Sequence, residues 1–529
     1  MRKAILSFAL LSVLAVLHVN AAADRHPSLD TLYVLGGELS NSAATSINDI
    51  DEVMPRMAAI GLNTVLVPAY WEFIEPVEGQ FDFTLVDRVI DRAREYRLQV
   101  VFLWFGTWKN SMSCYAPLWF KQDSKRFPRA MTRQGKPLEI ASCFSDQVLQ
   151  ADLKAFTRFM EHLAAKDKGI GTVAMVQIEN EIGMLEDARD HSPLAQKVYV
   201  KERWAQRYGT DAYADEKFMA LHYAQYVEHL AQAARSIYPI PLFVNAAMNS
   251  RGRRPGEYPS AGPLAHLMEF WHKGAPTIDM LCPDIYDTGF KSWTAQYAVP
   301  GNPLFIPESR CCANSGVRAL YTMGEYRAVG FSPFAIDQAP SADTWHITEA
   351  YRLLRQLKPY LRGNHSLRSW GLLFSQDDRE REITDGTTVI TCRHNFTLPW
   401  DPRATDGSTW PEGGGIVIRL ASNEYLVAGN GIVVEWKTTT EKQQEQQQKL
   451  GEDGFLQAGG QPTAAKEMSA HTTFWGKRLG IAFVDQVSVN ADGTFCFIRR
   501  DNGDQDHQGR HARIGVGEYK ILHVKLYEY

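Results

Sequence analysis

Two glutamates, each placed after a short apolar run, are the residues of this sequence best suited to chemistry. Glu181 follows the run Thr172–Ile178 after two polar residues, and Glu308 directly follows the run Pro303–Pro307. Runs this short and apolar are typical of strands buried on both faces, as in a parallel sheet. An α/β barrel keeps its chemistry at the C-terminal ends of such strands. Two carboxylates facing each other across one pocket there are the machinery for cleaving a glycosidic bond.

The two glutamates have separate predicted roles. Glu181 is the candidate general acid and base, because partial desolvation and a second carboxylate nearby raise the pKa of a carboxyl group. Glu308 is the candidate nucleophile, which must stay ionised behind the anomeric carbon. Asn180 can donate to a sugar hydroxyl, a bond that strengthens as oxocarbenium charge develops. The alternatives are a polar surface loop around Glu181 and an ordinary ion pair between Glu308 and Arg310.

Aromatic residues near the predicted strand ends are candidate platforms for the apolar face of a sugar. They are Trp71, Trp104, Trp108, Trp271, Tyr286 and Trp293. Packing at the top of a barrel is the alternative for half of them. Tyr286 ends the strand that precedes the one bearing Glu308, so its phenol could bond the nucleophile. Asp284 and Asp337 also lie near strand ends, where sugar binding and a structural role are equally open.

Eight strand-like runs that could position these side chains occur between residues 31 and 337. They are Leu32–Glu38, Thr64–Tyr70, Gln99–Phe105, Thr172–Ile178, Pro241–Asn245, Ile278–Tyr286, Pro303–Pro307 and Ala328–Ile336. Stretches with helical periodicity alternate with them, for example 49–60, 85–96, 146–164 and 217–237, and 350–361 is the expected last helix. This alternation predicts parallel βαβ units and, with eight of them, a (β/α)₈ TIM barrel. An open doubly wound sheet is the rival, but no Gly-rich dinucleotide fingerprint follows the first strand.

The character of the sequence changes after about residue 370. Short β-branched and aromatic runs then alternate with Gly, Asp and Asn turns, which predicts a smaller antiparallel β-sandwich domain. We expect a signal peptide at 1–23, a catalytic (β/α)₈ barrel at 24–365 and the C-terminal β-sandwich domain at 366–529. The polar tract 441–448 is expected to be an exposed loop or edge segment.

Composition and charge exclude several classes of function. The 529 residues carry a formal charge of −5, and 45% of them are hydrophobic, as in a soluble globular protein. No basic footprint for nucleic acid is present, and no zinc-protease motif, P-loop or Gly-x-Ser-x-Gly occurs. We therefore expect no nucleic-acid partner, no metal and no cofactor. The sequence leaves the oligomeric state open.

The N-terminus predicts export to the periplasm or the exterior. Arg2 and Lys3 precede the apolar stretch Ala4–Val19, and small residues follow at Ala21–Ala23. The apolar stretch is short for a membrane span, so a cleaved signal peptide is favoured over an uncleaved anchor, and no membrane span is expected after cleavage. Export permits disulfides among the seven cysteines. Cys114 with Cys143, and Cys282 with Cys311 or Cys312, are open pairings, with buried free thiols as the equal alternative.

The segment Val-Gln-Ile-Glu-Asn180-Glu181-Ile-Gly closely resembles the acid/base signature of glycoside hydrolase family 35, a family of retaining barrel β-galactosidases. Gly61-Leu-Asn-Thr-Val and Glu75-Pro-x-x-Gly-x-Phe-Asp-Phe resemble its second barrel unit, and Gly37-Glu38 resembles its first strand end. The resemblance covers roughly residues 31–340. It implies Glu181 as acid/base, Glu308 as nucleophile and Asn180 as partner of the sugar 2-hydroxyl, with Glu38 and Trp108 among the substrate contacts.

The sequence departs from the family where galactose hydroxyls are read. After the third strand the family often shows Gly-Pro-Tyr-x-x-x-Glu-Trp, whereas this chain reads Phe105-Gly-Thr-Trp108-Lys-Asn110. The chain looks like a bacterial branch associated with removing galactose from xyloglucan side chains of plant cell walls. The expected function is hydrolysis of terminal β-D-galactosides on an oligosaccharide or polysaccharide. The alternatives are a β-mannoside, a β-xyloside or an α-L-arabinoside as substrate, or a non-catalytic carbohydrate-binding barrel.

Overall fold

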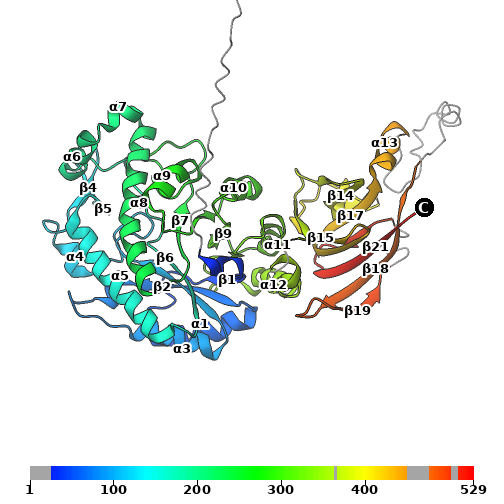
Figure 1. Cartoon of the computed structure of the whole chain (residues 1–529), viewed down its shortest axis with the longest axis horizontal. Coiled ribbons are helices and arrows are strands. Elements are labelled where there is room, and N and C mark those ends of the chain that lie inside the picture. The colour runs from blue at the N-terminus through cyan, green and yellow to red at the C-terminus, as the bar shows by residue number, and fades with distance from the viewer. Residues whose placement is uncertain (1–25, 363–365, 399, 449–475, 502–509) are drawn as a thin grey trace, which may run out of the picture.

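A computed structural model describes residues 26–362, 366–398, 400–448, 476–501 and 510–529 of the chain. The predicted signal peptide, residues 1–23, lies outside these described residues. The described part holds two bodies, a parallel barrel built from the first two thirds of the chain and an antiparallel domain built from the last third (Figure 1). Among the described helices, none has the length and apolar character needed to cross a membrane.

The first body is a (β/α)₈ TIM barrel, as the alternation of runs predicts. Its strands are β1 Val34–Glu38, β2 Thr64–Tyr70, β3 Gln99–Phe105, β6 Val173–Gln177, β7 Leu242–Ala247, β8 Met280–Ile285, β9 Phe305–Ile306, β10 Glu308–Ser309 and β11 Gly330–Phe331. All of them pair in parallel, and nearly all their residues are buried. Burial on both faces explains why these runs are continuously apolar instead of alternating.

The nine labelled strands form an eight-stranded barrel because β9 and β10 are two halves of one strand. Pro307, which lies between them, has no N–H to donate and interrupts the ladder. β9 pairs with β11, and β10 pairs with β8 through Glu308 opposite Asp284. The strand made of β9 and β10 therefore pairs with a neighbour on each side and closes the barrel, and Glu308 lies in its C-terminal half.

Helices surround the barrel and cover the outer face of its strands (Figure 1). They are α1 Ile47–Ile60, α2 Trp71–Ile74, α3 Thr84–Glu95, α4 Leu118–Gln122, α5 Asp146–Asp167, α6 Pro193–Lys201, α7 Trp204–Tyr208, α8 Ala212–Ile237, α9 Met268–Gly274, α10 Phe290–Tyr297, α11 Ser315–Tyr326 and α12 Ser341–Leu361. The sequence did not indicate one feature here, the small hairpin of β4 Arg129–Met131 and β5 Pro137–Ala141 inserted before α5.

The second body is an antiparallel sandwich of two sheets. Its strands are β12 Arg368–Phe374, β13 Glu380–Asp385, β14 Thr388–His394, β15 Gly413–Ala421, β16 Glu424–Asn430, β17 Ile432–Thr438, β18 Leu479–Val489, β19 Phe495–Arg500, β20 Ala512–Ile514 and β21 Lys520–Glu528. The sheet orders are β12-β15-β16-β21-β18-β19 and β13-β14-β17-β20. Buried side chains of both sheets, such as Val427 and Val434, share one apolar core. The last barrel helix ends at Leu361 and the first sandwich strand begins at Arg368, while the exact domain boundary stays a prediction.

The barrel and the sandwich are joined by packing as well as by the chain. Helix α11 lies against β12 and β15, and the bodies meet there in Figure 1. A Cβ placed on Gly324 of α11 would lie 2.8 Å from a side-chain carbon of Ile416, so glycine permits this close approach. Ile416 and Leu426 of the sandwich belong to the same apolar core as the barrel. Arg318 and Arg381 add ion pairs across the junction, to Glu412 and Glu325.

Two expectations need correction or completion. The polar tract 441–448 is not a loop or an edge segment, because it lies within helix α13, Thr439–Gln448. Straight-chain Glu, Lys and Gln residues have high helix propensity, and this outweighs their low apolar content. All seven cysteines are free thiols, so the bridges left open for Cys114, Cys143, Cys282, Cys311 and Cys312 are absent from the structure.

Candidate active site

The two predicted catalytic glutamates converge at the C-terminal end of the barrel. Glu181 lies four residues after the end of β6, and Glu308 opens β10. One carboxylate oxygen from each of Glu181, Glu308 and Asp284 can be chosen so that all three atoms lie within 4.8 Å of one another. All three side chains are buried. Glu181 and Glu308, 127 positions apart in the sequence, thus belong to one acidic cluster. Two carboxyl groups that act on the same glycosidic bond must lie this close together.

A strained turn aims Glu181 at the cluster. Glu179 and Glu181 both have positive φ values, 58° and 47°, which cost non-glycine residues roughly 1–2 kcal/mol each. The surrounding structure holds the turn through the Glu181 amide, which donates to Asn245 Oδ1 at 2.9 Å, and the Asn180 amide, which donates to the Trp108 carbonyl at 3.2 Å. Strain that neighbouring groups maintain in this way is common at functional sites.

A second tight turn, Lys109–Met112, braces the first one. Its ends exchange two backbone hydrogen bonds, and its central residues Asn110 and Ser111 have φ values of 50° and 63°. Positive φ at both central positions is the signature of a type I′ turn, and Asn tolerates it well. The Ser111 amide donates to the Glu181 carbonyl at 3.1 Å, and the Asn110 side-chain amide donates to Glu181 Oε2.

Lys109 fixes the orientation of the Asn180 side chain. Its ammonium donates to Asn180 Oδ1 at 2.9 Å. Because an ammonium has no acceptor, the amide oxygen must face Lys109 and the amide nitrogen must point the other way. That nitrogen lies 3.2 Å from Glu308 Oε1, to which it donates. Asn180 therefore connects the turn that carries Glu181 to Glu308. Its predicted contact with a sugar hydroxyl stays a prediction.

Two residues from neighbouring strands complete the hydrogen bonding around Glu308. Asn245 of β7 donates to Glu308 Oε1 at 3.2 Å and to Asp284 Oδ2 at 2.7 Å. The Tyr286 hydroxyl donates to Glu308 Oε2 at 2.8 Å, as predicted from its place on the preceding strand. Donors on both oxygens hold the direction of the Glu308 carboxyl group.

Burial and crowding of carboxyl groups shape the electrostatics of the site. Burial, and then the charge of Glu308, raises the pKa of Glu181 to about 7, against the opposing charge of Lys109. Burial first and Glu308 second also hold the pKa values of Glu38 and Asp284 well above their usual range. The raised pKa of Glu181 fits a group that gives and takes a proton near neutrality.

The other predicted contacts have mixed positions. Glu38, at the end of β1, is fully buried and both of its carboxylate oxygens lack a hydrogen-bond partner, so it has unused capacity for ligand hydroxyls. Trp108 is fully buried with its ring against Tyr223 and Tyr226, so it has no exposed face for stacking, and its predicted contact with the substrate stays a prediction. The remaining tryptophan candidates are buried too: Trp71, Trp104, Trp271 and Trp293. Tyr286, at 38% exposure, is the one candidate of the six with substantial open surface.

Sequence reasoning missed Lys109, Asn110 and Asn245. The signal for Asn245 was available, since an amide that ends the apolar run Leu242–Val244 is out of place in a buried strand unless it has partners. The signal for Lys109 and Asn110 was weaker, because a Lys-Asn-Ser sequence after a strand end is an ordinary turn composition.

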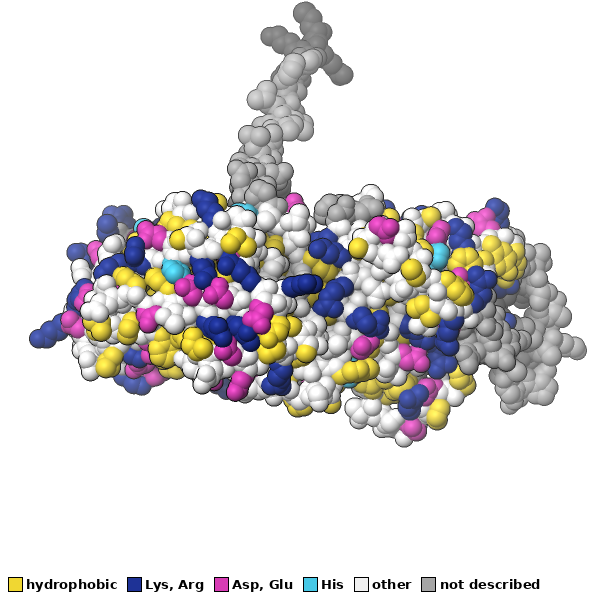
Figure 2. Space-filling view, turned by 90° about the horizontal axis from the view of Figure 1, so that it is seen from below, with side chains coloured by type: hydrophobic (Ala, Val, Ile, Leu, Met, Phe, Trp, Pro, Cys, Tyr) yellow, Lys and Arg dark blue, Asp and Glu magenta, His cyan; other side chains and the backbone are white. Residues whose placement is uncertain are grey.

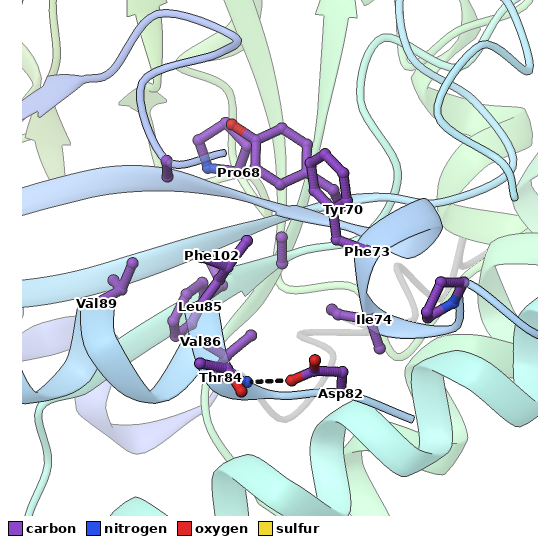
Figure 3. A pocket seen from close by; sticks show the side chains of 13 residues that line it. Pro68, Tyr70, Phe73, Ile74, Asp82, Thr84, Leu85, Val86, Val89 and Phe102 are labelled. Atoms are coloured by element: carbon purple, nitrogen blue, oxygen red, sulfur yellow. Dashed lines mark hydrogen bonds between the residues drawn. The ribbon is translucent and has the colours of Figure 1, made fainter. Parts of the chain in front are cut away.

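An apolar cavity of about 250 Å³ lies elsewhere, between the end of β2 and helix α3 (Figure 3). Tyr70, Phe73 and Leu85 line it, and its single acidic side chain, Asp82, accepts a hydrogen bond from the Thr84 amide at 2.8 Å. None of the clustered carboxylates borders this cavity. We therefore place the chemistry at Glu181 and Glu308 and not in this cavity.

Positive and negative side chains alternate over the face of the molecule shown in Figure 2. No field of one sign gathers there, in agreement with the near-balanced composition of 56 basic and 61 acidic residues. This face has no electrostatic footprint of a polyanion binder.

Residues 43–232 match a family model, Glyco_hydro_42, described as "Beta-galactosidase". The chain carries a glycoside hydrolase-like domain. Residues 347–513 match a second model, described as "Domain of unknown function" (DUF5597). The first match includes Asn180 and Glu181 and ends before Glu308. It supports a barrel glycosidase and does not assign the chain to family 35, which the motifs resemble.

Part of the chain also matches solved structures. They include the catalytic domain of β-amylase from Paenibacillus polymyxa, at 11% identity, TM-score 0.48 and coverage of 60% of this chain and 97% of that one. The β-galactosidase from Bacillus circulans sp. alkalophilus has 16% identity, TM-score 0.48 and coverage of 63% and 57%, and that from Marinomonas ef1 has 14%, 0.45, 62% and 60%. The chain thus spans about three fifths of the length of these β-galactosidases. No curated protein matches it.

Proposed function

We propose that this chain is an exported, retaining exo-β-galactosidase that acts on plant cell-wall oligosaccharides such as galactosylated xyloglucan. The observation that carries the proposal is the convergence of Glu181 and Glu308, with carboxylate oxygens within 4.8 Å of each other. Retaining glycosidases keep their carboxyl groups about 5–5.5 Å apart, whereas inverting ones need about 6.5 Å or more to admit a water between them. An approach of single oxygens to within 4.8 Å is compatible with the shorter, retaining separation, and the proposal therefore includes a covalent intermediate.

The proposed reaction has two steps. In the first, Glu308 attacks the anomeric carbon while Glu181 gives its proton to the departing oxygen, so the glycosidic bond breaks and a glycosyl ester with Glu308 forms. In the second, Glu181, now a carboxylate, takes a proton from water, and the water oxygen displaces Glu308 from the anomeric carbon. Glu181 regains its proton and Glu308 its charge, and the sugar leaves with its anomeric configuration retained.

The pKa of Glu181 predicts how activity depends on pH. Burial and the charge of Glu308 raise it to about 7. Glu181 must be protonated to act as the acid, so we expect kcat/KM to fall about tenfold per pH unit above pH 7. The pH profile of kcat/KM measures this directly. A plateau that extends well above pH 8 would contradict Glu181 as the group whose proton is transferred.

A panel of aryl glycosides tests the sugar. We expect turnover of the aryl β-D-galactoside to exceed that of the β-mannoside, β-xyloside and α-L-arabinoside at least about tenfold in kcat/KM, since a single hydroxyl read by buried polar groups can discriminate strongly. Proton NMR of the first product should show the β-anomer of galactose. Galactose release from xyloglucan oligosaccharides, compared with lactose, tests the substrate class. Turnover of none of the four glycosides would favour the non-catalytic carbohydrate-binding alternative.

A further inference from the structure

The residue before the Asn180-Glu181 pair carries a buried carboxyl group that the proposed reaction does not use. The Glu179 side chain is fully buried, behind the catalytic turn. Its Oε2 accepts a hydrogen bond from the Trp108 amide at 2.7 Å. Its Oε1 is equally buried, and no donor reaches it. A buried carboxylate oxygen without a donor costs several kcal/mol, roughly, so this atom requires an explanation.

Asp152 of α5 and Glu179 share the space around Gly106, where an added Cβ would lie 3.0 Å from Glu179 Oε1 and 2.1 Å from Trp104 Nε1, a donor to Asp152. Asp152 itself has donors on both oxygens. It accepts from Trp104 Nε1 at 2.9 Å, from the Thr107 hydroxyl at 2.7 Å and from the Tyr226 hydroxyl at 2.8 Å. With three donors already directed at it, Asp152 is placed to act as the acceptor in a bond with Glu179. The end of β3 and helix α8 therefore both donate to this side chain of α5.

A hydrogen bond between the two carboxyl groups would need a proton. Two ionised carboxylates in contact inside the protein would repel each other strongly, and neither could donate to the other. If Glu179 holds a proton, its hydroxyl donates to Asp152 and its other oxygen still accepts from Trp108. Burial first and the charge of Asp152 second hold the pKa of Glu179 well above its usual range, in the same direction as this geometric argument.

We propose that Glu179 is a neutral carboxylic acid that donates its proton to Asp152, and that this carboxyl pair positions the turn carrying Asn180 and Glu181. Glu179 has a left-handed backbone conformation, as Glu181 has two residues later. Its carbonyl is held by the Gln177 side-chain amide at 3.0 Å, and its carboxyl group by the helix outside the barrel. The pair is thus the anchor of a strained turn, and Glu179 is a positioning residue that acts through Glu181.

The isosteric variant Glu179→Gln tests whether Glu179 is a neutral acid or a carboxylate, because glutamine can replace only the neutral acid as a hydrogen-bond donor. Glutamine keeps both bonds, since its amide nitrogen can donate to Asp152 and its oxygen can accept from Trp108. We expect kcat/KM on an aryl β-galactoside within about threefold of wild type. Glu179→Leu fills similar space but makes neither bond. We expect about a 100-fold loss with poor leaving groups and a much smaller loss with activated ones, since a misplaced acid matters most for poor leaving groups.

A measurement that does not need activity tests the protonation itself. The infrared spectrum of the wild type should contain a carbonyl-stretch band of a buried carboxylic acid that is missing from Glu179→Gln. The infrared measurement depends only on the Glu179–Asp152 pair, whereas the kinetic measurement also rests on the proposed function. A failure of the pair can therefore be distinguished from a failure of the proposed function. The absence of any such difference band would overturn the protonated state of Glu179.

Glu216→Gln is the matched control for thermal unfolding. Glu216 is fully buried, its Oε1 accepts from the Tyr258 hydroxyl and the Ala261 amide, and its Oε2 lies 2.9 Å from His266 Nε2, so a neutral glutamine loses a charged acceptor that three groups use. We expect Glu216→Gln to lower the melting temperature by several degrees and Glu179→Gln to leave it nearly unchanged. A Glu179→Gln variant as damaged as Glu179→Leu, or a Glu179→Leu loss equal for good and poor leaving groups, would overturn the positioning role.

Discussion

Glu308→Ala is expected to lose turnover of an aryl β-galactoside by a factor on the order of 10⁴–10⁶, the range seen when a covalent nucleophile is removed. Without its carboxylate no glycosyl ester can form. Azide is small enough to occupy the vacated position, and it should restore part of the activity with α-galactosyl azide as product. Initial rates and product NMR measure both effects.

Glu349→Ala provides the control for that experiment. Glu349 is a carboxylate on helix α12 that pairs with Arg352 near the surface, where an ion pair contributes about 1 kcal/mol or less. We expect its activity to match wild type. Activity of Glu308→Ala close to that of Glu349→Ala would remove Glu308 from the mechanism and leave it as a structural hydrogen-bond acceptor for Asn245 and Tyr286.

Glu181→Ala is expected to slow different substrates by very different factors. Protonation of the departing oxygen matters most when the leaving group is a poor one, so cleavage of natural oligosaccharides should fall by on the order of 10³–10⁴. The first step on a dinitrophenyl galactoside needs little acid assistance and should fall far less. Steady-state rates across aryl leaving groups of graded acidity give this dependence.

The azide product distinguishes the two glutamates. In Glu181→Ala the covalent ester still forms, and azide then attacks it from the side where Glu181 stood, so the β-galactosyl azide is expected. The α product is expected from Glu308→Ala. Equal losses of Glu181→Ala on good and poor leaving groups, with no azide product, would mean that the Glu181 side chain only supports the turn between Asn110 and Asn245.

Much of the barrel could be predicted because its strands are buried on both faces. The runs Thr64–Tyr70 and Gln99–Phe105 coincide with β2 and β3 to the residue. The run Ala328–Ile336 was predicted too long, since regular pairing in β11 covers only Gly330–Phe331. An apolar sequence continues beyond the ladder wherever the chain stays buried, so burial alone does not set the end of a strand.

The convergence of Glu181 and Glu308 could be predicted from the sequence, but the side chains that orient them could not. Glu181 and Glu308 stand out because carboxylates are rare after buried strands. Lys109 and Asn110 act through a turn whose central residues adopt positive φ, a property that an Asn-Ser sequence permits without requiring. The burial of Trp108 could not be predicted, because the sequence does not reveal which aromatics at a barrel end face inward.

Helix α11, with one face against the barrel and another against β12 and β15, makes the two bodies interdependent. The second family match reflects the same arrangement, since it begins at residue 347, inside the last barrel helix, and not in the sandwich. A chain cut near residue 365 would expose Val317 and Tyr321 of α11, which are buried and now lie close to Gly414 and Gly371 of the sandwich. The barrel therefore depends on the sandwich for part of its packing. We expect the two bodies to be produced and engineered together.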